Sequence, residues 1–343
     1  MWCINFRAKV QGIERDYQPI FAKVKVFSNA RSFSSDAPVV LTIGTFDGVH
    51  VGHRAVLDLL KTRAKEQGGQ TVLLTFDPHP RTVLHPGNHQ LKLLNTPEEK
   101  ELLLADAGLD NLVIQPFTEE LSRMTPLEYV REIFAEGIRP ATVIVGYDHR
   151  FGRNREGSFE SLVNLGKVFG FEVEELPAHT VENTRVSSTK VRDAITSGEV
   201  ELARRWLNRP FPFTGTVIRG EQLGRRMGYP TANLRSHETL KLIPGRGVYA
   251  AWARIEGESN WQPAMINVGT RPTVADKATT ESLEVHFLEG GRQCYNENVS
   301  LQFIARLRDE QTFTGLKALQ NQLQQDDVHA RSILESKAAS LIG

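Results

Sequence analysis

Two histidines, His50 and His53, lie in a glycine-rich segment whose residue types could bind a phosphate. Gly44, Gly48 and Gly52 would let the backbone approach an anion closely, and a helix after His53 would present unpaired N–H groups and the positive end of its dipole. Imidazoles at a helix start can donate to phosphate oxygens and stabilise charge on a nucleotide α-phosphate under attack. For an isolated pair, metal ligands or polar loop residues would be the favoured interpretation. The preceding apolar strand, the glycines and the following helix favour phosphate binding.

A second group of interest is the pair Ser188 and Thr189, which begins a predicted helix. Ser and Thr are preferred at helix starts as caps, and a helix start is itself an anion site, so the two roles are compatible. Asp77 and Asp148 each follow an apolar run and could assist Mg²⁺. Lone aspartates are as often solvated or capping, so both readings stay open for them.

A third group begins with a glycine-rich, basic stretch over residues 215–234. Gly220 and Gly224 fit a loop whose N–H groups cradle phosphates, although no Gly-Lys-Ser/Thr follows as a Walker A loop requires. A hairpin rich in turn glycines is the alternative. In Pro-Thr-Ala-Asn, the hydroxyl of Thr231 and the amide oxygen of Asn233 could both ligate Mg²⁺, which favours the phosphate loop.

Glu284 stands in an alternating Leu-Glu-Val-His-Phe run. A carboxylate there could accept the proton of a hydroxyl that attacks a γ-phosphoryl group. By alternation Glu284 shares a face with His286 and opposes the apolar residues, so it could also be an outward, solvated charge. Periodicity alone leaves both roles open.

The first half of the chain alternates short apolar runs with amphipathic segments. We expect strands at residues 39–43, 71–76, 112–114 and 142–145, with helices at 54–67, 97–107 and 126–136. Strands separated by helices predict βαβ units and a Rossmann-like parallel sheet covered on both faces. Ligands of such sheets bind at the carboxyl ends of the strands, which is where the histidine pair lies.

The pattern changes after two predicted helices, 188–197 and 199–207. The two prolines in Asn-Arg-Pro-Phe-Pro, residues 208–212, cannot continue a helix. Short β-rich runs follow at residues 213–218, 247–255, 263–268, 282–288 and 299–307, and a helical pattern spans 316–341. They predict a small antiparallel β-barrel with a closing helix. We therefore expect an α/β domain at 24–208, a barrel domain at 209–343 and an N-terminal extension of unknown role at 1–23.

Composition agrees with two domains and excludes some functions. The chain has 343 residues, and Lys+Arg and Asp+Glu both number 41, so no global positive field favours nucleic acid. Cys3 and Cys294 cannot form a disulfide framework and show no metal-ligand spacing, which fits a reducing, cytoplasmic location. No run approaches the roughly 18 to 20 apolar residues of a membrane helix. The basic, serine-containing N-terminus lacks a secretory core and carries Glu14 and Asp16, so we expect a plain extension rather than a targeting segment.

Residues 44–53 resemble the HxGH signature of nucleotidylyltransferases and, more narrowly, the adenylyltransferase module of bacterial bifunctional riboflavin kinase/FMN adenylyltransferases, the FAD synthetases. Segments 75–80, 145–152 and 185–192 resemble the family's flavin-side loop, a segment with nucleotide and flavin contacts, and the Ser-Ser-Thr-x-x-Arg signature. The resemblance implies catalytic roles for His50 and His53 and flavin contacts for Asp77 and Phe151, whereas His149 replaces an aromatic of the pattern. It implies ATP contacts for Gly44, Phe46, Asp47, His50, His53, Asp148, Ser188, Thr189 and Arg192.

Residues 215–234 strongly resemble the riboflavin kinase signature, and segments 266–273 and 283–287 agree with it. The resemblance implies that Gly220, Gly224, Thr231 and Asn233 bind ATP, that Thr231 and Asn233 also hold Mg²⁺, and that Glu284 is the catalytic base. It extends from about Val24 to the helix near Leu341.

The implied function is phosphorylation of riboflavin to FMN by ATP, then adenylylation of FMN by ATP to FAD with release of pyrophosphate. Small-molecule flavins and ATP are the expected partners, with no nucleic acid, no membrane, and a monomer or weak self-association. A flavin carrier with one inactive site would lack Glu284, Asn233 or one histidine, and all are present. A nucleotidylyltransferase of another substrate would not need the Pro-Thr-Ala-Asn loop.

Overall fold

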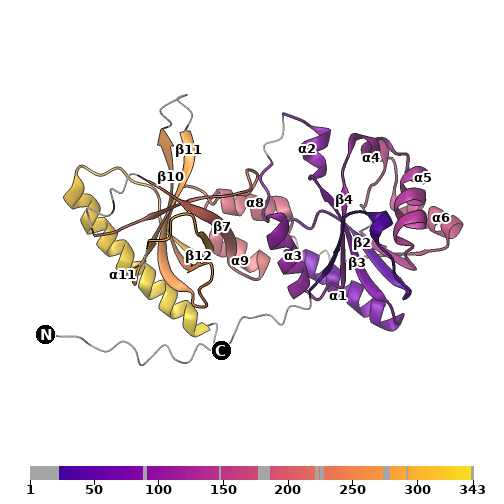
Figure 1. Ribbon diagram of the computed structural model, residues 1–343, viewed down its shortest axis with the longest axis horizontal. Coiled ribbons are helices and arrows are strands. Elements are labelled where there is room, and N and C mark those ends of the chain that lie inside the picture. Colours follow the sequence, from indigo (N-terminus) through magenta and orange to yellow (C-terminus); the bar gives the residue numbers. More distant parts are fainter. Residues whose placement is uncertain are drawn as a thin grey trace.

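The computed structural model describes residues 23–87, 91–146, 148–176, 186–220, 224, 228–272, 279–290 and 293–340 (Figure 1). A parallel sheet with its helices forms one part of the molecule and a β-barrel with a long helix forms the other. Figure 1 shows α3, α8 and α9 between the sheet and the barrel. Among the described residues, no helix has the length and apolar character needed to cross a membrane.

The parallel sheet has six strands in the order β1-β4-β3-β2-β5-β6. Its strands are β1 (Lys25–Phe27), β2 (Val39–Ile43), β3 (Gln70–Asp77), β4 (Asn111–Pro116), β5 (Thr142–Val145) and β6 (Glu172–Glu175). The four central strands are nearly continuous apolar runs, as expected of strands buried on both faces, and the predicted Rossmann-like sheet is confirmed. The chain order reverses between β2 and β5, so the crevice for a ligand lies beyond the carboxyl end of β2.

Alternate residues of the central strands enter two separate cores. Leu41, Leu74 and Val143 face one side with Phe134, whereas Val40, Leu73 and Ile144 face the other side with Leu57 and Leu104; both groups are fully buried. The covering helices are α1 (Val51–Glu66), α3 (Pro97–Asp106), α4 (Glu119–Arg123), α5 (Pro126–Tyr129) and α6 (Phe159–Phe169). The short helix α2 (Pro80–Leu84) buries none of its residues. The helix predicted at 126–136 is α5 followed by a π-helix, Val130–Ile138. The elements α6, β1 and β6 were not predicted.

The barrel closes in the order β10-β11-β8-β7-β12-β9, with every pairing antiparallel, and it confirms the predicted second fold. Its strands are β7 (Phe211–Ile218), β8 (Ala232–Arg235), β9 (Gly247–Ile255), β10 (Gln262–Pro272), β11 (Thr279–Phe287) and β12 (Asn298–Arg308). Strand β7 alternates buried and half-buried residues, since its inward side chains fill the barrel. The closing helix α11 (Leu316–Ser340) packs Ala330 and Leu334 against Ala250, Met265 and Ile304 on the outside of the barrel.

Two helices join the halves and pack on the barrel. They are α8 (Ser188–Thr196) and α9 (Val200–Leu207). Val191 and Ile195 of α8 share one buried cluster with Phe211, Tyr249 and Phe303 of the barrel strands. Helix α8, which begins with Ser188 and Thr189, therefore lies between the crevice of the sheet and the barrel core.

Candidate active sites

The histidine pair lies at the start of α1, directly beyond the carboxyl end of β2. His50 is the N-cap of α1, and its Nδ1 accepts the backbone N–H of His53 at 3.3 Å. In the neutral ring the proton is then on Nε2, where it can donate to a ligand. The rings of Phe46, His53 and His50 form a stack, with centroids 4.5 Å and 3.7 Å apart. The structure therefore brings the two histidines together, in contact with each other and with Phe46.

Burial keeps both imidazoles neutral. It lowers the pKa of His50 to about 4, and it lowers the pKa of His53 well below its ordinary value, with the charges of Lys100 and Arg209 acting in the same direction. The Nδ1 atom of His53 is buried and has no hydrogen-bond partner among the described residues. A buried polar atom in this state needs a partner, and an oxygen of a bound ligand could supply one.

Asp47 connects the histidine loop to α8. Its buried carboxylate accepts the N–H groups of Leu94 at 2.9 Å and Asn95 at 3.3 Å through Oδ1, and its Oδ2 pairs with Arg192 Nη2 at 2.8 Å. Ser188 Oγ donates to the carbonyl of Asp47 at 2.7 Å. The carboxylate thus fixes the guanidinium of Arg192 at the crevice.

The other residues predicted for this site lie around the same loop and the strand ends. Gly44 follows β2, where an added Cβ would lie 3.0 Å from the ring of Phe46, and Thr189 is exposed in the first turn of α8. Asp77 and Asp148 are exposed, at the end of β3 and after β5.

Phe151 occupies a different setting. Its side chain is only 6% exposed, and its ring packs 5.8 Å from Tyr129 and 5.9 Å from His149, within a core of the sheet. Burial lowers the pKa of His149 to about 4, and its Nε2 is buried without a partner among the described residues. Tyr147 and Arg185, which belong to the segments 145–152 and 185–192, lie outside the described residues.

Two charged residues of this site, Lys100 and Arg209, were not predicted, and His79 lies in segment 75–80 but was given no role of its own. Lys100, in the first turn of α3, has its pKa lowered by burial, an effect opposed by the carboxylates of Asp47 and Asp77. His79, the N-cap of α2, has a pKa lowered to about 4 by burial. Arg209 donates to the carbonyls of Gly48 at 2.7 Å and Val49 at 3.3 Å, and burial lowers its pKa to about 10. Neutral imidazoles beside these cations form a setting suited to an anion.

The second candidate site lies on the outer face of the barrel. Asn233 of β8, Glu284 of β11 and Asn267 of β10 are register partners across three adjacent strands. Thr231 Oγ1 donates to Glu284 Oε2 at 3.0 Å. The structure therefore brings Thr231, Asn233 and Glu284 together, whereas Leu283 and Val285 point into the barrel. Asn267 belongs to segment 266–273, for which no individual role was predicted.

The backbone at Gly220 lies close to this row, and the backbone at Gly224 lies close to Tyr229. A Cβ on Gly220 would lie 2.0 Å from Asn233 Nδ2, and one on Gly224 would lie 2.2 Å from the carbonyl of Tyr229. The Pro230 carbonyl accepts a hydrogen bond from His286 Nδ1 at 2.8 Å, which closes the other end of the loop. A larger residue at position 220 would displace the Asn233 amide, and one at position 224 would collide with the backbone at Tyr229.

The donor set of this row fits a hard divalent cation. A hydroxyl, an amide oxygen and a carboxylate are ligands that Mg²⁺ accepts while it keeps waters and bridges phosphates. In the described part of the chain, no group of three or more His, Cys, Asp or Glu residues could hold a metal ion. A metal here would therefore need the uncharged oxygens of Thr231 and Asn233.

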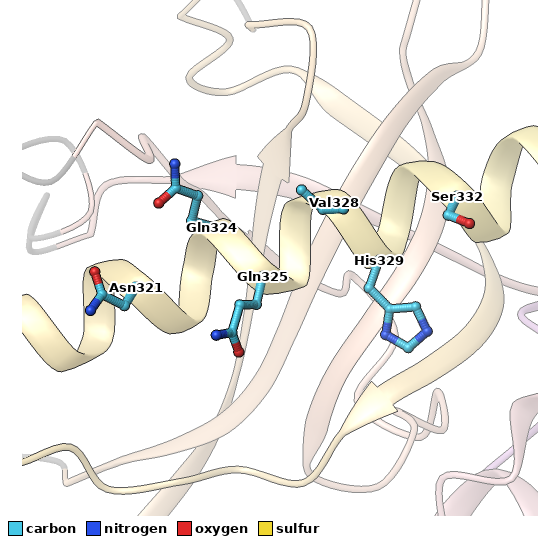
Figure 2. Close-up of a pocket in the computed structure, with 6 residues that line it drawn as sticks. All are labelled: Asn321, Gln324, Gln325, Val328, His329 and Ser332. Carbon is cyan, nitrogen blue, oxygen red and sulfur yellow. The ribbon is translucent and has the colours of Figure 1, made fainter.

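A hollow of about 740 Å³ lies along α11, and Figure 2 shows the residues that line it. Its described lining comes from this one helix: Asn321, Gln324, Gln325, Val328, His329 and Ser332. Side chains from one helix face do not converge on a point, and we assign no chemistry to it.

Comparison with known proteins identifies both halves. The FAD synthetase family matches residues 32–190, and the riboflavin kinase family matches residues 207–334. Two bifunctional riboflavin kinase/FMN adenylyltransferases, from Listeria monocytogenes and Pseudomonas fluorescens, are each 36% identical to the chain; the matches cover 87% of it and 93% and 94% of those proteins. A crystal structure from Streptococcus pneumoniae described as a macrolide-efflux protein is 28% identical, with a TM-score of 0.80 over 90% of this chain and 99% of that one. The chain belongs to the bifunctional riboflavin kinase/FMN adenylyltransferase family.

Proposed function

We propose that the barrel site phosphorylates riboflavin to FMN and that the crevice of the parallel sheet then adenylylates FMN to FAD. The observation that carries the proposal is the pairing of two complete sets of residues in one chain. One set is the ring stack of His50 and His53 beside Arg192, and the other is the contact of Thr231 with Glu284 beside Asn233. The first set suits charge stabilisation at an α-phosphate, and the second suits transfer of a γ-phosphoryl group.

In the kinase reaction, Glu284 accepts the proton of the riboflavin hydroxyl as that hydroxyl attacks the γ-phosphorus of ATP. The hydrogen bond from Thr231 orients the carboxylate, and the outward face of β11 presents it to the substrate. Thr231 and Asn233 would hold Mg²⁺, which supplies charge neutralisation for the β- and γ-phosphates. The loop at Gly220 and Gly224 binds the phosphates through its N–H groups, and ADP leaves.

In the adenylylation, an oxygen of the FMN phosphate attacks the α-phosphorus of a second ATP and pyrophosphate leaves. His50 and His53 donate hydrogen bonds to the α-phosphate as its charge grows. Ser188, Thr189 and Arg192 hold the departing phosphates at the start of α8. The phosphate dianion is already a nucleophile, so this step needs no general base.

The remaining assignments of the site belong to the same proposal. Following the family resemblance, we assign ATP contacts to Gly44, Phe46, Asp47 and Asp148, and flavin contacts to Asp77 and Phe151. For Asp47 the geometry supports an action through Arg192. We assign adenylylation to residues 24–208 and the kinase to residues 209–343, in a cytoplasmic protein that is a monomer or self-associates weakly. The extension at 1–23 has no assigned role, and its residues 1–22 lie outside the described part of the chain.

The test is to incubate the purified protein with riboflavin, ATP and Mg²⁺ and to separate FMN and FAD by chromatography. We expect both products, and neither product when the divalent cation is removed with EDTA. Glu284→Gln should abolish FMN formation but leave conversion of added FMN to FAD intact. His53→Ala should slow FAD formation and leave the kinase intact. A wild-type protein that forms neither product refutes the proposal.

A further inference from the structure

Residues 93–99 lie between the two halves and are bound by the barrel through backbone and side-chain contacts. The N–H of Leu93 donates to the carbonyl of Leu240 at 2.7 Å, and the N–H of Leu242 donates to the carbonyl of Leu93 at 2.8 Å. Between these two barrel residues, Lys241 turns its side chain inward, where it is 0% exposed. Its Nζ donates to the Leu94 carbonyl at 2.8 Å and pairs with Glu99 Oε2 at 2.5 Å.

The same segment holds the histidine loop on its other side. The N–H groups of Leu94 and Asn95 bind the carboxylate of Asp47, whose other oxygen pairs with Arg192. Asn95 Oδ1 also accepts the N–H of Gly48 at 2.6 Å. Gly48 has φ of 89°, and a Cβ there would lie 2.6 Å from a methyl group of Leu94, so the loop and the segment are in tight contact. A shift of the segment would therefore move Asp47, Arg192 and the loop together.

The surroundings of Lys241 indicate that its role is to hold residues 93–99 in place. An ammonium removed from water is costly unless it is paired, and here a carboxylate, a carbonyl and the ring of Phe211 at 4.7 Å surround it. An apolar side chain of similar volume would fill the space without that desolvation cost, but it could not direct the Leu94 carbonyl and Glu99 to one point. Glu99 also accepts the N–H of Thr96, the N-cap of α3, so the ammonium fixes the start of this helix as well.

We propose that Lys241, a residue of the kinase half, is a positioning residue of the adenylylation site. It anchors residues 93–99, so that Asp47 directs Arg192 to the ATP phosphates and Asn95 fixes the loop of the histidine pair. The barrel is then a structural component of the second reaction as well as the catalyst of the first. The inference rests on the proposed function of the crevice, and it adds a residue from outside the adenylylation unit.

The test uses Lys241→Met in the full chain, with each reaction started from its own substrate. We expect kcat/KM for FAD formation from FMN to fall about 10-fold or more, because misplacement of catalytic groups by about 1 Å can cost 100-fold. Formation of FMN from riboflavin should stay within twofold of wild type. Lys92→Met is the matched control, since Lys92 Nζ also crosses the junction, to the Thr239 carbonyl at 3.0 Å, but remains exposed; both of its rates should stay at wild type.

A double-variant cycle separates positioning from general destabilisation. If Lys241 acts through Asp47 and Arg192, Lys241→Met should add little to the loss already caused by Arg192→Ala, because the two act along one chain of contacts. Glu99→Gln keeps the side-chain volume and should reproduce the selective loss if Lys241→Met does not fold. Three results would each overturn the inference. The losses of Lys241→Met and Arg192→Ala could multiply in the double variant, the rates of FMN and FAD formation could fall in parallel, or Lys241→Met could form FAD at the wild-type rate. Failure of the wild-type protein to adenylylate FMN would instead refute the proposed function.

Discussion

The close approach of Gly220 to Asn233 allows a direct test of the kinase site. A Cβ at position 220 would lie 2.0 Å from Asn233 Nδ2 and 2.7 Å from its Cγ, whereas ordinary contact begins at 3.4 Å. Gly220→Ala must therefore separate the loop and the amide by about 1.4 Å. A displacement of about 1 Å at a catalytic group can cost roughly 100-fold in rate. We expect kcat/KM for riboflavin phosphorylation to fall about 100-fold, or ~2.7 kcal/mol of transition-state stabilisation.

The assay is steady-state formation of FMN with riboflavin and ATP varied in turn, beside conversion of added FMN to FAD. The second reaction should be unchanged, since Gly220 lies in the barrel half. Gly315→Ala is the matched control, because no atom lies within 4 Å of its Cβ position. Riboflavin phosphorylation at the wild-type rate in Gly220→Ala would refute the placement of Asn233 at the reacting phosphates. An equal loss of both reactions would show disrupted folding instead.

Two further predictions concern the crevice of the sheet. Lys100→Met should raise KM for ATP in FAD formation and leave the kinase unchanged, because a buried ammonium beside Asp47 and Asp77 would be lost; an unchanged KM in steady-state kinetics would contradict this. The free energy of unfolding should decrease as the pH falls from 6.5 to about 4, because the unfolded chain protonates at His50 whereas the folded chain does not until about pH 4. At 1.36 kcal/mol per unit of pKa, the titration of His50 lowers the free energy of unfolding by about 3 kcal/mol over this pH range. Urea titrations at stepped pH would measure the decrease. His50→Gln should make that profile shallower without abolishing the slope, because burial also lowers the pKa of His79 and of His149 to about 4. An unaltered slope in this variant would exclude a contribution from His50.

The central architecture was predictable because its signals are local. The inner strands of the sheet are apolar runs, and the barrel strands alternate buried and half-buried residues. The edge strands gave no such signal: β1 has three mostly exposed residues, and β6 is Glu-Val-Glu-Glu. These segments are extended because they pair with a neighbouring strand, and their sequences show no hydrophobic periodicity that would predict this pairing.

The same distinction applies to the sites. His50, His53 and Thr231 stand in short motifs with a definite order of glycine, imidazole or hydroxyl residues, so their types and spacing suggested phosphate chemistry. Lys241 and Arg209 were missed, because their partners at Leu94 and Gly48 lie about 150 residues earlier in the chain. Only the packing of the two halves makes those contacts, and a motif within one half cannot encode them.

The shared core of α8 and the barrel determines which parts of the molecule unfold together. Val191 and Ile195 are buried among barrel residues, so local unfolding that frees α8 must expose part of the barrel core. Amide protons of α8 should therefore exchange at rates set by the barrel strands rather than by the parallel sheet. The helix that we propose binds phosphates in the crevice, α8, thus unfolds together with the barrel, which contains the other active site.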